Sequence, residues 1–543
     1  MKNIIDPICR GLSEKSNKPF TLNSRSCKCV LKQVANNTRE EVKKELNKRL
    51  ISLKIDSASR LSRNIFALSA QYINNYNIQS RILGMVELKG VASSSSRNIA
   101  AEIMKILSKY GVGLNQVVSI TSDNGANMIK SSKILSHCSV LKEDRDDVDE
   151  ANDVYLKNIE MFNDTLKIQM GDIEICRCAA HTAQLCALDS TKDPVIKSYL
   201  MNCRNLTKYI KKNSNGYREI FELKKLALPQ LDCPTRWGST YNMIKNIYNS
   251  KDVLVNIESV KNKSQDENFE LNDDLWAFIK SYYTVFEPLQ KTIIKFQAEA
   301  LHYGDFYAQW LRCKLLTEKI LQTHDDSLSH TIGKNLLRNI EIRTSKLLTN
   351  DSLNACLFLD PRFNHTLTAD KRADAITYLK KLYDRLKEMG CIKSDKTNSF
   401  NNTSVRLNEE HREDEDEYIN AYLCQNLEAR NDDDIDVYSK IENLKLSFQR
   451  ISTNVLEFWK ERQFADPELY ALTNICFAVP PTQVTIERAF SSLKLILTDN
   501  RNRLGQDMLE DILIVKLNPM YLDKAVNELS LFEDMDGIMD SVD

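Results

Sequence analysis

The stretch VVSITSDNGANM, residues 117–128, decides the fold because an apolar run leads directly into a carboxylate. Its first residues are apolar or β-branched and predict a buried strand. Asp123, Asn124 and Gly125 follow, and Asn and Gly tolerate left-handed backbone and mark a turn. Two interpretations of Asp123 stay open here: it caps the next element, or it is a functional carboxylate at a strand tip. Further carboxylates at suitable places in the chain would favour the second.

Three strands in succession are predicted upstream of this stretch. In ISLKID, residues 51–56, apolar and polar residues alternate, so Asp56 lies on the face opposite the apolar one. The ranges 64–73 and 81–89 predict two further strands, whose short polar connections permit an antiparallel meander. The strand that leads to Asp123 is therefore the fourth in the series.

A helix links this meander to the 117–123 strand, and Gly111 ends it. Its apolar face consists of Ile99, Ile103, Ile106, Leu107 and Tyr110. A helix-linked return to a sheet usually makes a right-handed crossover to a parallel neighbour. If that neighbour is the 51–56 strand, Asp56 and Asp123 meet at the carboxyl ends of parallel strands, where open sheets place their sites.

Composition bounds the class of protein. A chain of 543 residues allows about two to four domains, and 42% hydrophobic residues allow ordinary cores. No apolar run approaches the roughly 18 residues of a membrane span, and the first residues lack the apolar core of a signal peptide, so we expect an intracellular protein. Because the net charge is −1, any site for a polyanion is a local patch. The richest basic stretch, residues 204–225, is either such a patch or a solvated helix face.

The rest of the chain is predicted to be mostly helical. The acidic residues 141–155 predict a mobile loop, after which a short strand runs into a helix at about Ala179. Helical periodicity continues to about residue 470, interrupted by the polar tract 393–417, which we expect to be disordered. After a Pro-Pro break two more helices follow, and the first of them carries Glu487.

Six motifs together resemble the hAT-type transposases, DNA cut-and-paste enzymes with an RNase H-like core split by a large helical insertion. The motifs occur in the family's order over most of the chain. They are ISLKID, ITSDNGANM, CRCAAHTAQL, DCPTRWGSTYNMI, FLDPRF, and PPTQVTIERAFSSL followed by RNRL. The resemblance implies an α/β fold, in which an RNase H-like core with a mixed five-stranded sheet and flanking helices is interrupted by an all-α insertion domain. The implied divisions are an N-terminal helical segment (1–50), the first part of the core (51–210), the insertion (211–470), the last part of the core with the dimerisation region (471–525) and an acidic tail (526–543).

The resemblance assigns catalysis and metal binding to Asp56, Asp123 and Glu487. Carboxylates suit this chemistry because Mg²⁺, or Mn²⁺ in its place, takes oxygen ligands and keeps waters for exchange. Two such ions about 3.5–4 Å apart would activate the attacking oxygen and stabilise the leaving one during displacement at phosphorus. Glu487 is then expected to project from a helix packed on the sheet, with Phe490 facing inward.

Four further residues are implied to contact DNA, each with a structural alternative. Trp237 would stack on a base displaced from the duplex while Arg236 reaches a phosphate, or Trp237 is a core or interface residue. The resemblance favours stacking. Arg501 and Arg503 either contact phosphates or cap helix ends.

Cys178 and His181 form a CxxH pair that the resemblance places in the wall of the active site or in contact with DNA near the cut. The alternative is a buried Cys and a His at a helix start. A zinc site is not expected, because no second pair with suitable spacing lies nearby.

The implied partners are double-stranded DNA, at transposon ends and target sites, and a second copy of the chain. Residues 507–517, DMLEDILIVKL, are too apolar for a free surface helix, so they pack on the core or on a second subunit. The resemblance favours a dimerisation role for this C-terminal region. No membrane contact is expected, and the implied location is the nucleus.

The chain departs from the family pattern in one respect that bears on function. Cys9, Cys27 and Cys29 lack the paired CxxC and downstream histidines of the BED-type zinc finger that begins many relatives. Two functions therefore stay open. The first is a Mg²⁺-dependent transposase that cleaves strands, forms a hairpin on the flanking DNA and joins the excised ends to target DNA. The second is a domesticated or defective copy that acts as a DNA- or protein-binding dimer without catalysis.

Overall fold

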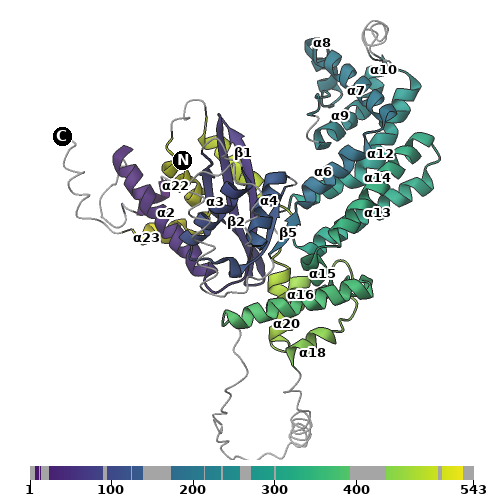
Figure 1. Ribbon diagram of the computed structural model, residues 1–543. Helices are drawn as coiled ribbons and strands as arrows, with labels where there is room; N and C mark the ends of the chain where they lie inside the picture. Colours follow the sequence, from purple (N-terminus) through teal and green to yellow (C-terminus); the bar gives the residue numbers. More distant parts are fainter. Residues whose placement is uncertain are drawn as a thin grey trace, which may run out of the picture.

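The computed structural model describes residues 6–11, 13, 24–89, 95–123, 125–137, 173–212, 214–233, 237–256, 269, 271–298, 301–391, 436–498 and 504–529. It combines a five-stranded mixed sheet with many helices, which confirms the predicted α/β class (Figure 1). Within these ranges, no helix is long and apolar enough to cross a membrane. The predicted loop 141–155, the tract 393–417 and the tail from residue 530 onward lie outside the described residues.

The sheet has the strand order β3-β2-β1-β4-β5. Its strands are β1 (Ile51–Arg60), β2 (Arg63–Asn74), β3 (Asn77–Glu87), β4 (Val117–Ser122) and β5 (Glu174–Arg177). The first three strands form the predicted antiparallel meander. β4 lies parallel to both β1 and β5, so the predicted crossover to a parallel neighbour is confirmed.

The register between β1 and β4 brings the two aspartates level with each other. Lys54 of β1 pairs with Thr121 of β4. If this register is extended by two residues, Asp56 lies opposite Asp123, the residue that directly follows β4. Since neighbouring strands lie about 4.8 Å apart, the backbones at these two positions are adjacent.

Helices cover both faces of the sheet. On one face, α3 (Ser96–Lys109) and α4 (Ala126–His137) pack against the apolar residues of β1. On the other face, α21 (Val484–Ile496) packs on β1 and β2, and α22 (Gln506–Leu517) packs on β3. The alternation of apolar and polar residues in β1 therefore separates two layers, and Asp56 belongs to the side of α21.

α22 is the apolar helix that the sequence places on the core or on a second subunit, and it packs on the core. α2 (Ser24–Leu46) lies along it, as the purple and yellow ribbons in Figure 1 show, and β3 covers another side. Its side chains at Leu509, Ile512 and Leu513 are at most 2% exposed. The short α23 (Leu522–Asn527) also packs on α2.

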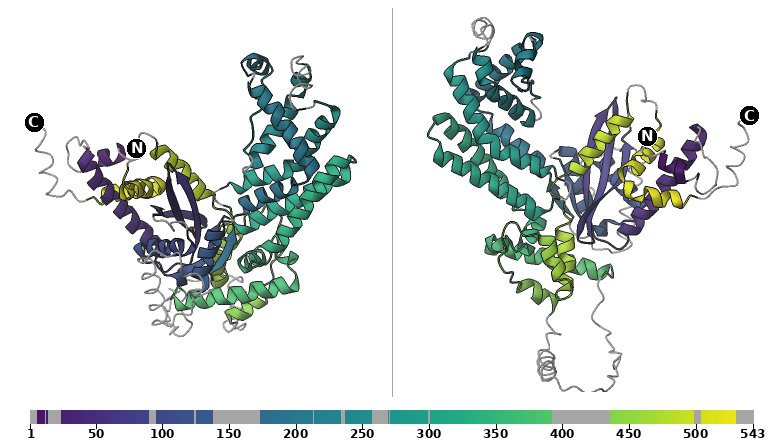
Figure 2. Two further views of the ribbon diagram at one scale, coloured as in Figure 1. Left: turned by 45° about the horizontal axis from the view of Figure 1, so that its top comes forward. Right: turned by 180° about the vertical axis from the view of Figure 1, so that it is seen from behind.

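A large helical region follows β5. Its helices are α6 (Ala179–Ser190), α7 (Pro194–Lys212), α8 (Ser214–Leu223), α9 (Trp237–Asn249), α10 (Lys251–Asn256), α12 (Asp273–Phe296), α13 (Tyr303–Thr323), α14 (Ser327–Leu347), α15 (Asp351–Leu359), α16 (Ala369–Glu388), α18 (Val437–Glu442), α19 (Val455–Glu461) and α20 (Pro467–Cys476). α6 to α14 project away from the sheet, and α15 to α20 form a second group beside it (Figures 1 and 2). α6 and α7 pack against α9 and α12.

Candidate active site at the carboxyl ends of two parallel strands

Asp123 occupies the turn between β4 and α4, and both interpretations of this residue find support in its position. Its Oδ1 accepts a hydrogen bond from the backbone N–H of Gly125 at 2.9 Å, which is the capping contact typical of Asp in a turn. A Cβ atom on Gly125 would lie only 2.8 Å from the same oxygen, so glycine leaves the space that the carboxylate occupies. The turn fixes the carboxylate beside the end of β1.

Asp56 lies on β1 at the point where the strand passes beyond its parallel neighbour. Its Oδ1 accepts a hydrogen bond from the N–H of Ser57 at 2.7 Å. Because β2 pairs with β1 along its whole length on the other side, the backbone at Asp56 is held by the sheet. Asp56 therefore has little freedom to move relative to Asp123.

A single segment, residues 478–485, brings the C-terminal part of the chain to this place, and we call it the docking segment. Three strands and the first residue of α6 donate one hydrogen bond each to it. The bonds are Gln71 Nε2 to Ala478 O at 2.9 Å, Thr121 Oγ1 to Pro480 O at 2.7 Å, Ala179 N to Pro481 O at 2.8 Å and Lys54 Nζ to Thr485 Oγ1 at 2.8 Å. The docking segment thus lies across the sheet, and α21 starts from it.

Glu487 is in the first turn of α21, two residues beyond the contact of Thr485 with Lys54. Ile486 and Phe490 of this helix are buried, which confirms the expected inward orientation of Phe490, whereas Glu487 is exposed. The helix therefore packs on the sheet by its apolar side and presents Glu487 at the surface of that layer.

The electrostatics of Asp56 show that the three carboxylates share one region. Burial raises the pKa of Asp56 to about 7, the Ser57 N–H opposes this rise, and the negative charges of Asp123 and Glu487 add to it. Both of these residues thus lie within interaction range of Asp56, although Asp123 and Glu487 are far apart in the sequence. Among the described residues, no three His, Cys, Asp or Glu side chains are close enough together to enclose a metal ion.

The donor set fits a hard divalent cation better than a soft one, because all three groups are carboxylates. A positive charge between Asp56 and Asp123 would also offset the repulsion that helps raise the pKa of Asp56. These two residues are the first candidates to hold a cation, and Glu487 is the third.

Cys178 belongs to the wall of this site, directly before α6. Its N–H donates to Ser122 O at 2.8 Å, which continues the pairing of β5 with β4 up to the residue before Asp123. The side chain has no exposed surface, and burial raises the pKa of its thiol to about 11. His181 lies in the first turn of α6 and is partly exposed.

The structure does not describe the side chains of the other residues predicted to contact DNA. Arg236, Arg501 and Arg503 lie outside the described residues. Trp237 is the first residue of α9, and the position of its side chain is also outside what the structure describes. Their roles toward DNA stay predictions.

Residues that sequence reasoning missed are the partners of the docking segment, above all Lys54. Lys54 is only 2% exposed although it is charged, and it lies on the same side of β1 as Asp56. The signal was present in the sequence: a lysine on the polar side of a strand that is otherwise buried needs a partner from another element. Gln71 and Thr121 give no comparable signal because their partners are backbone carbonyls.

The fold and the site define an α/β protein with an acidic centre at strand ends and a large helical region. Residues 434–519 match the hAT family C-terminal dimerisation region, and residues 176–285 match the ZBED1 RNase-like helical domain. The chain is similar to a protein named Putative AC transposase from Zea mays, with 24% identity over 373 residues. That alignment covers 63% of this chain and 43% of the maize protein, so the chain spans less than half of its length. The two matched regions and this similarity support an hAT-family transposase.

Proposed function

We propose that this protein is a cut-and-paste DNA transposase whose catalytic residues are Asp56, Asp123 and Glu487. The observation that carries the proposal is the convergence of negative charge on Asp56 from two distant parts of the chain. The sheet supports an RNase H-like core, since its order is 3-2-1-4-5 and β2 alone runs against the other strands. The helical region between β5 and α21 would then be the family's all-α insertion.

The proposed chemistry is cleavage of one DNA strand, formation of a hairpin on the flanking DNA by transesterification, and transfer of the excised ends to target DNA. Bound Mg²⁺ or Mn²⁺ would activate the attacking oxygen and stabilise the leaving oxygen at phosphorus. The protein supplies placement: the paired strand β1 holds Asp56, the Gly125 N–H holds Asp123, and α21 carries Glu487. Because Asp56 loses its proton near pH 7, the site gains affinity for cations as the pH rises toward that value.

Double-stranded DNA is the proposed substrate, and α7 and α8 offer a basic surface for its phosphates. The exposed lysines of these helices and of the turn after α8 are Lys197, Lys208, Lys211, Lys212, Lys224 and Lys225. Lys208, Lys211 and Lys212 are three and four residues apart, so they share one side of α7. In this proposal Trp237 holds an unpaired base, while Arg236, Arg501 and Arg503 contact phosphates. The proposed location is the nucleus, where such DNA is found.

A homo-oligomer is the proposed working form, because residues 434–519 match a dimerisation region. A second candidate function, a transposase-derived protein that binds DNA or protein without catalysis, is favoured by one observation. The described carboxylates interact but do not form a closed group of three metal ligands. In that case the acidic site would be a relic of the family's chemistry.

A nicking assay distinguishes the two candidates. Purified protein would be incubated with DNA that carries the ends of the element, with Mg²⁺, with Mn²⁺ and with chelator. A transposase cleaves only with the divalent ion, and Asp123→Asn abolishes cleavage while binding of the same DNA persists. Asp305→Asn, an aspartate of α13 in the helical region, is the matched control and leaves cleavage intact. Cleavage by the Asp123 variant at the wild-type rate, or binding without cleavage by the wild-type protein, would reject the proposed chemistry.

A further inference from the structure

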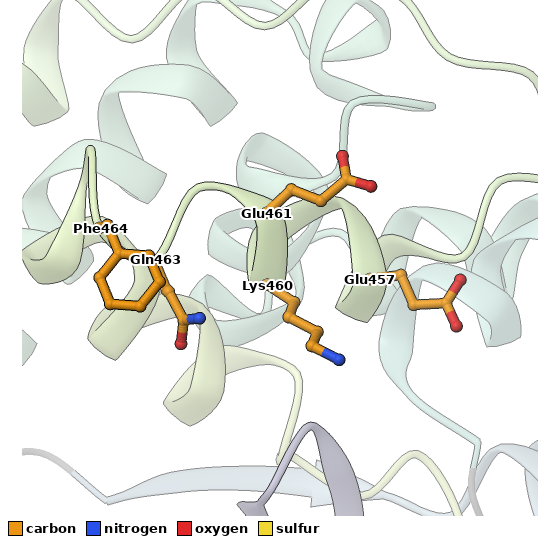
Figure 3. Close-up of a pocket in the computed structure, with 5 residues that line it drawn as sticks. All are labelled: Glu457, Lys460, Glu461, Gln463 and Phe464. Carbon is orange, nitrogen blue, oxygen red and sulfur yellow. The ribbon is translucent and has the colours of Figure 1, made fainter.

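Phe464 is the most exposed large apolar side chain among the described residues, at 89%. It lies in the turn between α19 and α20 and forms one wall of a hollow of about 400 Å³. The other residues that line the hollow are Glu457, Lys460, Glu461 and Gln463, and Figure 3 shows them around it. A Phe side chain left in water gives up much of the free energy that its burial would provide.

Two of the side chains that line this hollow have partners in the sheet, so the turn that carries Phe464 is tied to the rest of the fold. The Tyr76 hydroxyl donates to Gln463 Oε1 at 2.7 Å, and Lys460 Nζ lies 4.5 Å from the centroid of the Tyr76 ring. Tyr76 itself belongs to the two-residue turn between β2 and β3. Trp459 Nε1 donates to Leu359 O at 2.9 Å in the core below. The sheet and the helical region thus both hold Phe464 and the residues that line the hollow, which we call the patch, in place.

The patch lies within residues 434–519, which match the dimerisation region of the family. α22, an apolar helix of this range, is already covered by α2 and β3, which bury its side chains Leu509, Ile512 and Leu513. The exposed large apolar residues in the described part of the match are Phe448, Ile451, Phe464 and Leu495. Phe448 has a ring partner, His365, at a centroid distance of 5.2 Å, whereas Phe464 stands beside a hollow.

We propose that Phe464 and the hollow beside it form the surface on which a second copy of this chain binds, an inference that rests on the proposed homo-oligomer. A two-fold symmetric contact requires one patch to contain both a projecting and a receiving element. Phe464 projects and the hollow receives, and the residues that line the hollow carry both signs of charge on Glu457, Lys460 and Glu461. Burial of one Phe strengthens association by about ten- to a hundredfold, and the symmetric contact buries two.

Sedimentation equilibrium of the full chain over a range of concentrations tests this surface. Phe464→Ser is expected to raise the dimer Kd by at least about a hundredfold. The matched control is Leu223→Ser at the end of α8, because Leu223 is 83% exposed and lies outside the match. This control is expected to leave the Kd within about twofold of the wild-type value.

Hydrogen exchange of the unmodified protein gives a second readout that does not depend on the variant. Peptides that contain residues 457–464 are expected to exchange more slowly as the protein concentration rises, while peptides of α8 do not change. A wild-type protein that stays monomeric overturns both the homo-oligomer and this surface. A dimer that tolerates Phe464→Ser, that weakens equally with Leu223→Ser, or that leaves residues 457–464 unprotected overturns the surface alone. The nicking assay tests the catalytic proposal separately.

Discussion

Substitution of Asp56 by Asn should stabilise the metal-free protein, which is the opposite of what loss of a buried polar group usually does. Burial and the charges of Asp123 and Glu487 hold the pKa of Asp56 at about 7, above the ordinary value of 3.8. Between pH 3.8 and 7, the folded protein therefore still binds a proton that the unfolded chain has lost. As a result, the ionised Asp56 destabilises the fold progressively from pH 3.8 to 7 and fully above pH 7. The asparagine side chain of the variant has no charge and keeps an oxygen for the Ser57 N–H.

The size of the effect follows from the pKa difference. The rise of the pKa from 3.8 to about 7 corresponds to a loss of roughly 4 kcal/mol in folding stability above pH 7, since one pKa unit is worth about 1.4 kcal/mol. When the pH is raised from 5.5 to 8, the stability advantage of Asp56→Asn over the wild type should grow by about 2 kcal/mol. Hydrogen exchange of β1 and β4 peptides in chelator measures the local free energy of opening at both pH values. This readout suits a large chain, in which global unfolding is not a two-state process.

A control with the opposite sign is available in Asp232. Burial raises its pKa, but hydrogen bonds from Arg204 and Thr240 outweigh this and leave the pKa lowered, so Asp232→Asn should destabilise the α7 region at pH 7. With Mg²⁺ present, the wild-type site should be stabilised and the advantage of the Asp56 variant should shrink. If Asp56→Asn is no more stable than the wild type at pH 8, or if its gain in stability does not change with pH, Asp56 does not carry a destabilising charge. The proposed acidic centre would then lose its main support.

Three further predictions test the placement of the site and its approach to DNA. Gly125→Ala should slow nicking at least about tenfold while the free energy of unfolding changes by less than about 1 kcal/mol. The reason is that the new Cβ would lie 2.8 Å from the Asp123 oxygen, and only that flexible carboxylate has to move. A variant that nicks DNA at the wild-type rate would exclude a role for this geometry. Lys54→Met removes the hydrogen bond to Thr485, so hydrogen exchange should show that the free energy of opening of the first turn of α21 falls by about 1–2 kcal/mol, with β3 unaffected. An unchanged α21 would mean that the other hydrogen bonds of the docking segment are enough to hold it. The third variant replaces three lysines of α7 by Ala: Lys208, Lys211 and Lys212. The slope of the logarithm of the association constant for duplex DNA against the logarithm of salt concentration should become less steep by about 0.9 for each phosphate that the variant no longer neutralises. An unchanged slope would mean that DNA binds elsewhere.

The parts of the site that the sequence could predict depend on local patterns. The period of two in residues 51–56 identified β1 and the side of Asp56, and the helix between the meander and residues 117–123 indicated a parallel neighbour. Together these patterns are enough to set Asp56 beside Asp123. Phe490 was predictable for the same reason, because helical spacing from Glu487 determines its side of the helix.

The position of Glu487 could not be predicted in this way. It depends on the docking segment, whose residues Ala478 and Pro480 lie 407 and 359 residues after their partners Gln71 and Thr121. Side-chain bonds to backbone carbonyls leave no pattern in the sequence of either partner. Nor could the sequence decide whether α22 packs inside the chain or on a second copy, since its apolar residues suit both. Only the packing of α2 and β3 against it resolves this question.

The helical region itself brings the two halves of the acidic site together. Closing a flexible loop of about 300 residues costs roughly 5 kcal/mol of chain entropy, a term that grows only slowly with length. The structure shows what offsets this loss. Cys176, Cys178 and Ala179 at the start of the region share one continuous buried core with Cys476, Phe477 and Val479 at its end. Folding of the helical core therefore places both ends side by side, and the bond from Ala179 N to Pro481 O at 2.8 Å joins them directly. Since α21 begins three residues later, variation within the helices far from these ends leaves Glu487 in place, whereas a change at Phe477 or Ala179 should displace it.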